Sequence, residues 1–64
     1  MVSDQPTRKV VKMLRAAGFE PVRTVGSHTV YRNGEVNVTV PDGHRRISPG
    51  VYRVILKKIE EARE

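Results

Sequence analysis

Sixty-four residues suffice for one small domain with a thin hydrophobic core, and they leave no interior that could enclose a large cofactor. The chain lacks cysteine and any apolar run near the roughly 20 residues of a membrane span, which excludes disulfides, thiolate metal sites and a transmembrane helix. Twelve Lys and Arg against seven Asp and Glu give a net charge of +5, which favours RNA, DNA, an anionic surface or an acidic protein as partner.

The N-terminal residues 1–6 are polar and contain a proline, so we expect them to fray. They lack the basic segment and apolar stretch of a secretion signal, which fits a protein of the reducing cytoplasm. A helix is predicted over residues 8–17, with Thr7 as its N-cap and Gly18 as the left-handed residue that ends it. Its buried stripe consists of Val10, Leu14 and Ala17.

The same helix carries a second stripe, which is basic. Its members follow the same helical spacing and are Arg8, Lys12 and Arg15. This stripe is either a solvated helix surface or a face that contacts phosphates.

Three strands are predicted next, over residues 19–25, 28–32 and 35–40. Asn33-Gly34 between the last two predicts a two-residue type I′ hairpin turn, which would place Tyr31 opposite Val36 and His28 opposite Thr39. Side chains alternate between the two faces of a strand, so one face becomes apolar and the other polar. The apolar face collects Thr29, Tyr31, Val36, Val38 and Val40, and the polar face collects His28, Val30, Arg32, Asn37 and Thr39.

A turn at residues 41–43 and a short basic loop at residues 44–47 lead to a second helix over residues 49–63, with Ser48 as its N-cap. Its buried stripe is predicted as Val51, Ile55, Ile59 and Ala62, widened by Val54 and Leu56. Two helices with apolar stripes and a sheet with one apolar face predict a two-layer α+β domain of order α-β-β-β-α. This is the layout of the double-stranded-RNA-binding domain, and we expect it to form a single domain over residues 1–64.

Gly26-Ser27-His28 lies where the first strand ends and the second begins. Glycine allows a sharp turn and a close approach of a nucleic-acid backbone, and Ser27 offers a small hydroxyl. His28 opens a strand, and an imidazole can exchange protons near neutral pH. A lone histidine at a strand start is more often a surface or packing residue, but the polar face predicted here favours a surface site.

Six short motifs together resemble the HicA-type mRNA interferases, the toxins of HicA–HicB toxin–antitoxin pairs. They are Gly18-Phe19, Gly26-Ser27-His28, Tyr31, Val40-Pro41, Pro49-Gly50 and Ile55-Leu56. The resemblance covers about residues 8–57. It implies the double-stranded-RNA-binding fold and makes His28 the functional histidine. Family members often carry a second histidine two residues after the Val-Pro proline; that position is Gly43 here, so no role is carried over to His44.

The resemblance implies a metal-independent endoribonuclease that cleaves mRNA, with His28 as general acid or base and Gly26 and Ser27 contacting RNA. Arg32, Arg45 and Arg46 are candidate phosphate ligands, although simple electrostatic steering is an alternative role for each. No cluster of carboxylates or histidines has the spacing of metal ligands, so neither a metal nor another cofactor is expected.

Two other functions fit the same residues. The chain could be a non-catalytic RNA-binding module of this fold, in which His28 only contacts RNA. It could also be a basic docking domain for an acidic protein such as a HicB-like antitoxin. All three interpretations place the protein in the cytoplasm, with mRNA or an antitoxin as partner and no membrane.

Overall fold

The computed structural model describes residues 4–63. The elements follow the order β1 (Gln5–Pro6), α1 (Thr7–Ala16), β2 (Glu20–Val25), β3 (His28–Asn33), β4 (Val36–Val40), β5 (Arg46–Ile47) and α2 (Pro49–Arg63). Strands β2, β3 and β4 form an antiparallel sheet in that order, and β1 pairs with β5 in a separate two-stranded ribbon.

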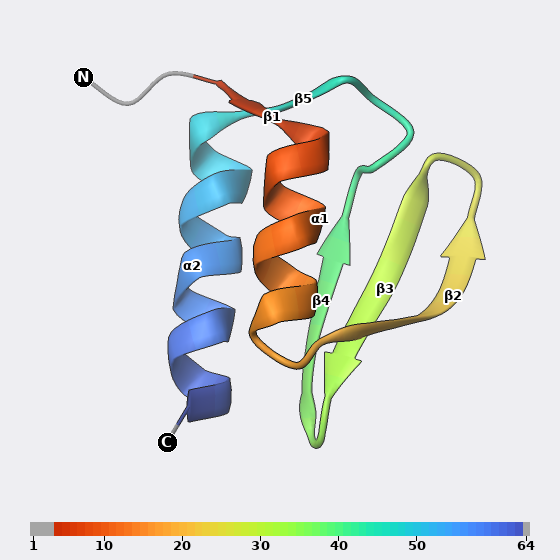
Figure 1. The fold of residues 1–64 in the computed structure, drawn as a ribbon. Coiled ribbons are helices and arrows are strands. Elements are labelled where there is room, and N and C mark those ends of the chain that lie inside the picture. The colour runs from red at the N-terminus through yellow and green to blue at the C-terminus, as the bar shows by residue number, and fades with distance from the viewer. Residues whose placement is uncertain (1–3, 64) are drawn as a thin grey trace.

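The two helices lie side by side and cover the same face of the three-stranded sheet (Figure 1). The predicted two-layer α+β fold of order α-β-β-β-α, like that of double-stranded-RNA-binding domains, is therefore confirmed. The two small strands β1 and β5 are additions to that pattern. Neither helix within residues 4–63 is long and apolar enough to cross a membrane.

The hydrophobic core lies between the helices and the covered sheet face. Its buried members are Val10, Leu14, Phe19, Tyr31, Val38, Val40, Ile47 and Ile55. On β3 and β4 the side chains alternate as predicted, because Tyr31 and Val38 are only 3% and 4% exposed whereas His28 and Asn37 are exposed. The sequence pattern thus identified correctly which face of the hairpin packs against the helices.

The register of the β3–β4 hairpin differs from the prediction by two residues. Tyr31 pairs with Val38 and Asn33 with Val36, so the loop is Gly34-Glu35 rather than Asn33-Gly34. Gly34 has a φ of 61° as the first loop residue, as in a type II′ turn, and no residue other than glycine in residues 4–63 has positive φ. A shift of two residues leaves every side chain on its predicted face, because strand side chains repeat every second residue.

Asn33 stays in the strand because its side chain has another role. Its Nδ2 donates a hydrogen bond of 2.9 Å to the carbonyl oxygen of Ala17, at the C-terminal end of α1. A Cβ atom at Gly18 would lie 2.9 Å from the same Nδ2, and Gly18 has a φ of 89°. The contact fixes the end of the helix against the hairpin and favours a glycine at position 18.

The helices cover β4 and β3 but not β2, which lies at the far edge of the sheet (Figure 1). All six residues of β2 are exposed, including Val22 and Val25. In α2, Ser48 caps the helix as predicted, because its Oγ accepts a hydrogen bond from the Val51 amide. The predicted widening of the α2 stripe is wrong, because Val54 and Leu56 are 52% and 37% exposed.

Residues 1–6 were expected to fray. Residues 1–3 lie outside the described part of the chain. Gln5 and Pro6 instead form β1 and pair with Ile47 and Arg46. Thr7 was expected as an N-cap but is the first residue of α1, and its side chain makes a tertiary contact described below. Both corrections have one cause, the pairing of segments about 40 residues apart, which local sequence patterns do not encode.

Asn33→Ala should lower the free energy of unfolding by about 1 kcal/mol, because it removes the side-chain hydrogen bond to the Ala17 carbonyl. Asn37→Ala is the matched control, because Asn37 is exposed on the opposite sheet face, and it should change stability by less than about 0.5 kcal/mol. Urea denaturation of the three proteins measures both values. Equal stability of the two variants would show that Asn33 does not hold the helix end.

Candidate functional site

Gly26 and Ser27 form the two-residue connection between β2 and β3, since Val25 pairs directly with His28. Gly26 has a φ of 60°, a conformation that side chains disfavour, and no other group would contact a Cβ added there. His28 is the first residue of β3 and is exposed. The sequence prediction of an exposed histidine held at the end of a strand therefore agrees with the structure.

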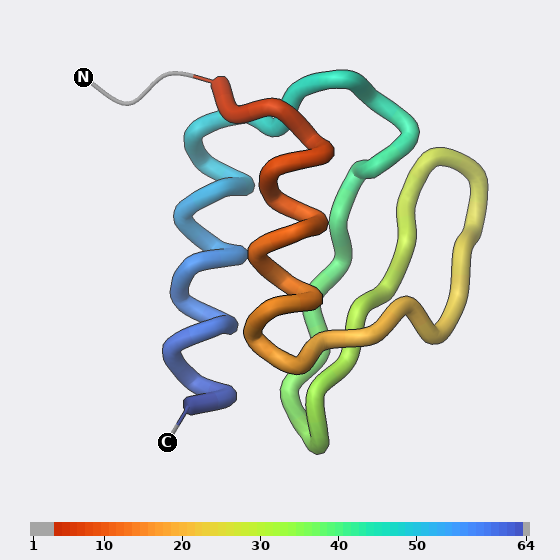
Figure 2. The backbone as a smooth tube through the Cα atoms, in the orientation of Figure 1, coloured from red at the N-terminus to blue at the C-terminus, as the bar shows by residue number. Residues whose placement is uncertain are grey.

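The loop at residues 41–45 packs directly against this turn. The Gly43 amide donates a hydrogen bond of 2.9 Å to the Ser27 carbonyl oxygen. A Cβ atom at Gly43 would lie 2.8 Å from Ser27 Cα and closer still to Ser27 Cβ, so only glycine fits this contact without a shift. The turn and the loop meet at one end of the molecule (Figure 2), which brings the segments carrying His28 and His44 together.

Asp42 ties the same loop to the sheet. Its Oδ1 accepts a hydrogen bond of 2.9 Å from Thr29 Oγ1, and its Oδ2 accepts one of 3.3 Å from the Tyr31 hydroxyl. Thr24 Oγ1 lies 3.0 Å from Thr29 Oγ1 and extends the network to β2. Burial, and then the adjacent Asp42 carboxylate, raise the pKa of Tyr31 above its ordinary value of 10.0.

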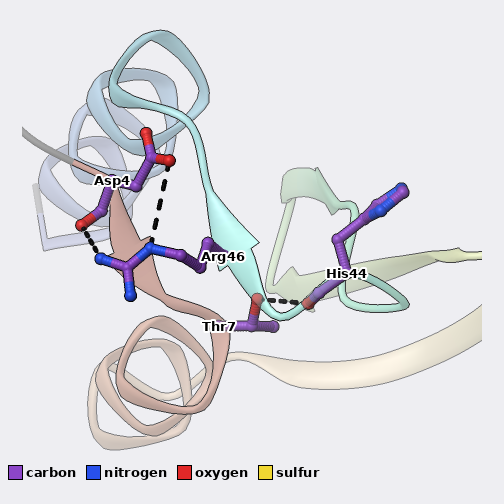
Figure 3. A network of polar contacts seen from close by, with 4 residues as sticks. All are labelled: Asp4, Thr7, His44 and Arg46. Carbon is purple, nitrogen blue, oxygen red and sulfur yellow. Dashed lines mark hydrogen bonds and ion pairs between the residues drawn. The ribbon is translucent and has the colours of Figure 1, made fainter.

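The N-terminal end of α1 holds the other side of the loop (Figure 3). Thr7 Oγ1 donates a hydrogen bond of 2.5 Å to the His44 carbonyl oxygen, and the Thr7 amide donates one of 3.0 Å to the Arg45 carbonyl oxygen. The His44 ring projects away from Thr7. Thr7 is 8% exposed, so these hydrogen bonds are shielded from water and fix the backbone of the loop.

The three predicted phosphate ligands occupy different positions. Arg46 is exposed, but its guanidinium donates a hydrogen bond of 2.8 Å to the Asp4 carbonyl oxygen and lies 4.0 Å from the Asp4 carboxylate. Arg32 Nε donates to the Gly34 carbonyl oxygen, and Arg32 lies four residues from His28 along β3, a rise of about 13 Å. Arg45 is exposed and lies in the predicted basic loop, whose backbone contacts the start of α1.

Sequence reasoning missed the parts of this end of the molecule that depend on tertiary contacts. Asp42 was recognised only as a turn residue and Thr7 only as a helix cap, yet both fix the loop beside His28. A pocket of about 460 Å³ lies there, lined by Pro6, Thr7, Arg8, Asp42, His44 and Arg45. No local signal could have revealed it, because its two walls are more than 30 residues apart.

Within residues 4–63 the structure contains no group of three or more His, Cys, Asp or Glu residues arranged to hold a metal ion. In the same range, every buried side-chain nitrogen and oxygen atom has a hydrogen-bond partner. The functional groups available at this site are an exposed imidazole, small hydroxyls and guanidinium groups.

The family model described as HicA toxin of bacterial toxin–antitoxin systems matches residues 7–60, which is most of the chain. The chain belongs to the HicA toxin family. Neither the comparison with curated proteins nor the comparison with solved structures gives a match. Membership implies that this HicA-family protein has an antitoxin partner, since the family comprises the toxins of toxin–antitoxin systems.

Gly43→Ala should displace the loop of this HicA-family protein from the Gly-Ser-His turn, because the new methyl group would overlap Ser27. We expect a loss of about 1–3 kcal/mol in the free energy of unfolding and shifted amide NMR signals at Ser27 and His28. Gly50→Ala is the control, because nothing lies within 4 Å of a Cβ there, and an alanine in α2 should stabilise the protein slightly. Unchanged signals at Ser27 in Gly43→Ala would contradict the close packing.

Tyr31→Phe should lower the free energy of unfolding at pH 7 by about 0.5–1.5 kcal/mol, because it removes the hydroxyl bonded to Asp42. Because the pKa of Tyr31 is raised in the folded state, its hydroxyl stabilises the folded protein fully below about pH 10. This stabilisation is lost as pH rises through the folded-state pKa. The stability difference between wild type and variant should therefore shrink above about pH 10. A difference that stays constant from neutral to strongly alkaline pH would contradict this account.

Proposed function

We propose that this HicA-family chain is a metal-independent endoribonuclease that cleaves mRNA, with His28 as its general acid or base. The observation that carries the proposal is the position of His28, exposed at the start of β3 and next to the docked loop at residues 41–45. Family membership supports the toxin role, and the net charge of +5 supports a polyanionic substrate.

Cleavage without a metal uses the 2′-hydroxyl of the RNA as nucleophile. The 2′-oxygen attacks the adjacent phosphorus as a base removes its proton, and the 5′-oxygen of the next nucleotide leaves as an acid protonates it. The products are a 2′,3′-cyclic phosphate and a free 5′-hydroxyl. His28 can supply one of these two proton transfers, which contributes roughly 10²–10⁴ in rate.

The remaining predicted residues have supporting roles in this proposal. Gly26 lets the RNA backbone approach the turn, and Ser27 offers a hydrogen-bonding group beside His28. Arg45 stabilises charge on phosphates near the site, whereas Arg32 suits a phosphate further along the strand and Arg46 adds to long-range attraction. The protein would act in the cytoplasm as one domain over residues 1–64, inhibited by a HicB-like antitoxin.

His28→Ala should reduce RNA cleavage by about 10²–10⁴-fold while folding and RNA affinity are nearly retained. The side chain is exposed, so its removal leaves no cavity and no unpaired buried group. Thr39→Ala is the control, because Thr39 is also exposed and lies on the same sheet face. Cleavage of one RNA in EDTA, together with growth arrest on induced expression, measures the effect.

Three results would overturn parts of the proposal. Equal cleavage by wild type and His28→Ala would remove His28 from the mechanism. RNA binding by a wild-type protein that neither cleaves RNA nor arrests growth would identify a non-catalytic RNA-binding module. Loss of wild-type cleavage in EDTA would show that a metal ion takes part.

A further inference from the structure

A pocket lies between the start of α1 and the loop at residues 41–45, and the mechanism above assigns a role to only one of its residues, Arg45. Its volume of about 460 Å³ lies within the range of ligand-binding pockets in proteins. Its lining includes two arginines, Arg8 and Arg45. The chemistry of this lining suits an anion.

Both guanidinium groups are available for a ligand. Arg8 and Arg45 are exposed, and the ion pairs found in residues 4–63 are Arg46 with Asp4 and Lys58 with Glu61, which leave these two without a carboxylate. Arginine without a protein partner in a concave site is suited to bidentate contact with phosphate oxygens.

The lining contains one carboxylate, Asp42, against the two arginines, and the contacts of Asp42 hold it to the sheet. Asp42 directs Oδ1 to the Thr29 hydroxyl and Oδ2 to the Tyr31 hydroxyl, so both oxygens already accept hydrogen bonds from the sheet. The first turn of α1 contains no acidic residue, and no side chain caps it. Its amide groups add to the positive potential set by the two arginines.

The pocket adjoins the Gly-Ser-His turn. Gly43, one residue from His44, donates its amide to Ser27, one residue from His28. A polyanion bound at His28 can therefore extend into the pocket. This adjacency favours a chain of linked phosphates over a small free anion.

We propose that the pocket lined by Thr7, Arg8, His44 and Arg45 is a subsite for an RNA phosphate that neighbours the phosphate at His28. The proposal rests on the proposed function in that it takes RNA as the substrate. Arg8 and Arg45 hold the phosphate oxygens, and the backbone of His44, bonded to Thr7, fixes the position of Arg45 next to it in the chain. Gly43 keeps the subsite at a fixed distance from His28, since any side chain there would overlap Ser27.

The first test uses inorganic phosphate and follows the backbone amide signals by NMR. Saturable shifts should be confined to residues 7–9 and 43–45, and Arg45→Gln should weaken binding about tenfold. Arg53→Gln is the matched control, because Arg53 is exposed on α2, outside the pocket lining, and removes the same charge. Shifts spread over the whole basic surface, or equal weakening by the two variants, would overturn the subsite.

The second test uses RNA in the His28→Ala background, so that binding is measured without cleavage. The RNA is a short segment around a linkage that the wild-type protein cuts, with each phosphate replaced in turn by a neutral methylphosphonate. One position next to the cut linkage should lose about tenfold in affinity with Arg45 present and much less in Arg45→Gln. The slope of log affinity against log salt should also fall by about 0.7 in Arg45→Gln, as for one lost contact to single-stranded RNA.

The outcomes separate this subsite from the proposed function. If the wild-type protein cuts no RNA, the ribonuclease proposal fails, and the methylphosphonate series is placed in an RNA that the protein binds. A phosphate position whose effect depends on Arg45 would then still support the subsite. Cleavage by wild type with no position coupled to Arg45 would overturn the subsite and leave the ribonuclease proposal intact. Phosphate binding without coupling in RNA would show a site for free phosphate, which also contradicts the proposal.

Discussion

The carboxylate of Asp42 is the contact on which the candidate site depends. It accepts hydrogen bonds from two hydroxyls of β3, and it lies in the loop that otherwise has few apolar anchors. With that loop held, Gly43 reaches Ser27 and the backbone of His44 reaches Thr7. Because a buried tyrosine hydroxyl without a partner would be costly, the core residue Tyr31 and the loop stabilise each other. The fold and the site therefore share one polar network.

Sequence patterns predicted the layers, the helices and the faces of the hairpin, because these follow from short periodicities that the chain repeats several times. The hairpin register was off by two, since Asn33 serves the end of α1 instead of the turn. The exposure of Val54 and Leu56 was also missed; both adjoin the buried Ile55 in sequence, so the helix turns them to either side of the face that packs on the core. The exposed position of His28 survived the register error, because an even shift keeps the face.

The parts of the site that could not be predicted join residues far apart in the chain. Thr7 and His44 are separated by 37 positions and Arg46 and Asp4 by 42, so no window of local sequence contains both partners. Contacts of this kind also decide which arginine side chains are available to bind a ligand. The guanidinium groups of Arg46 and Arg32 have protein partners, whereas those of Arg8 and Arg45 have no ion pair among residues 4–63. Net charge alone, which is what the sequence supplies, does not distinguish these two groups of arginines.

The candidate site is assembled from three separate stretches of chain: the start of α1, the turn before β3 and the loop before β5. The turn before β3 forms within the β2–β3 hairpin, but the start of α1 and the loop before β5 reach it only through tertiary contacts. During synthesis the first stretch leaves the ribosome more than 30 residues before the last, and the docking of the two must await the complete sheet. In a growing chain His28 therefore lacks the docked loop beside it. The activity proposed for this protein thus requires the folded chain and is absent from its nascent form.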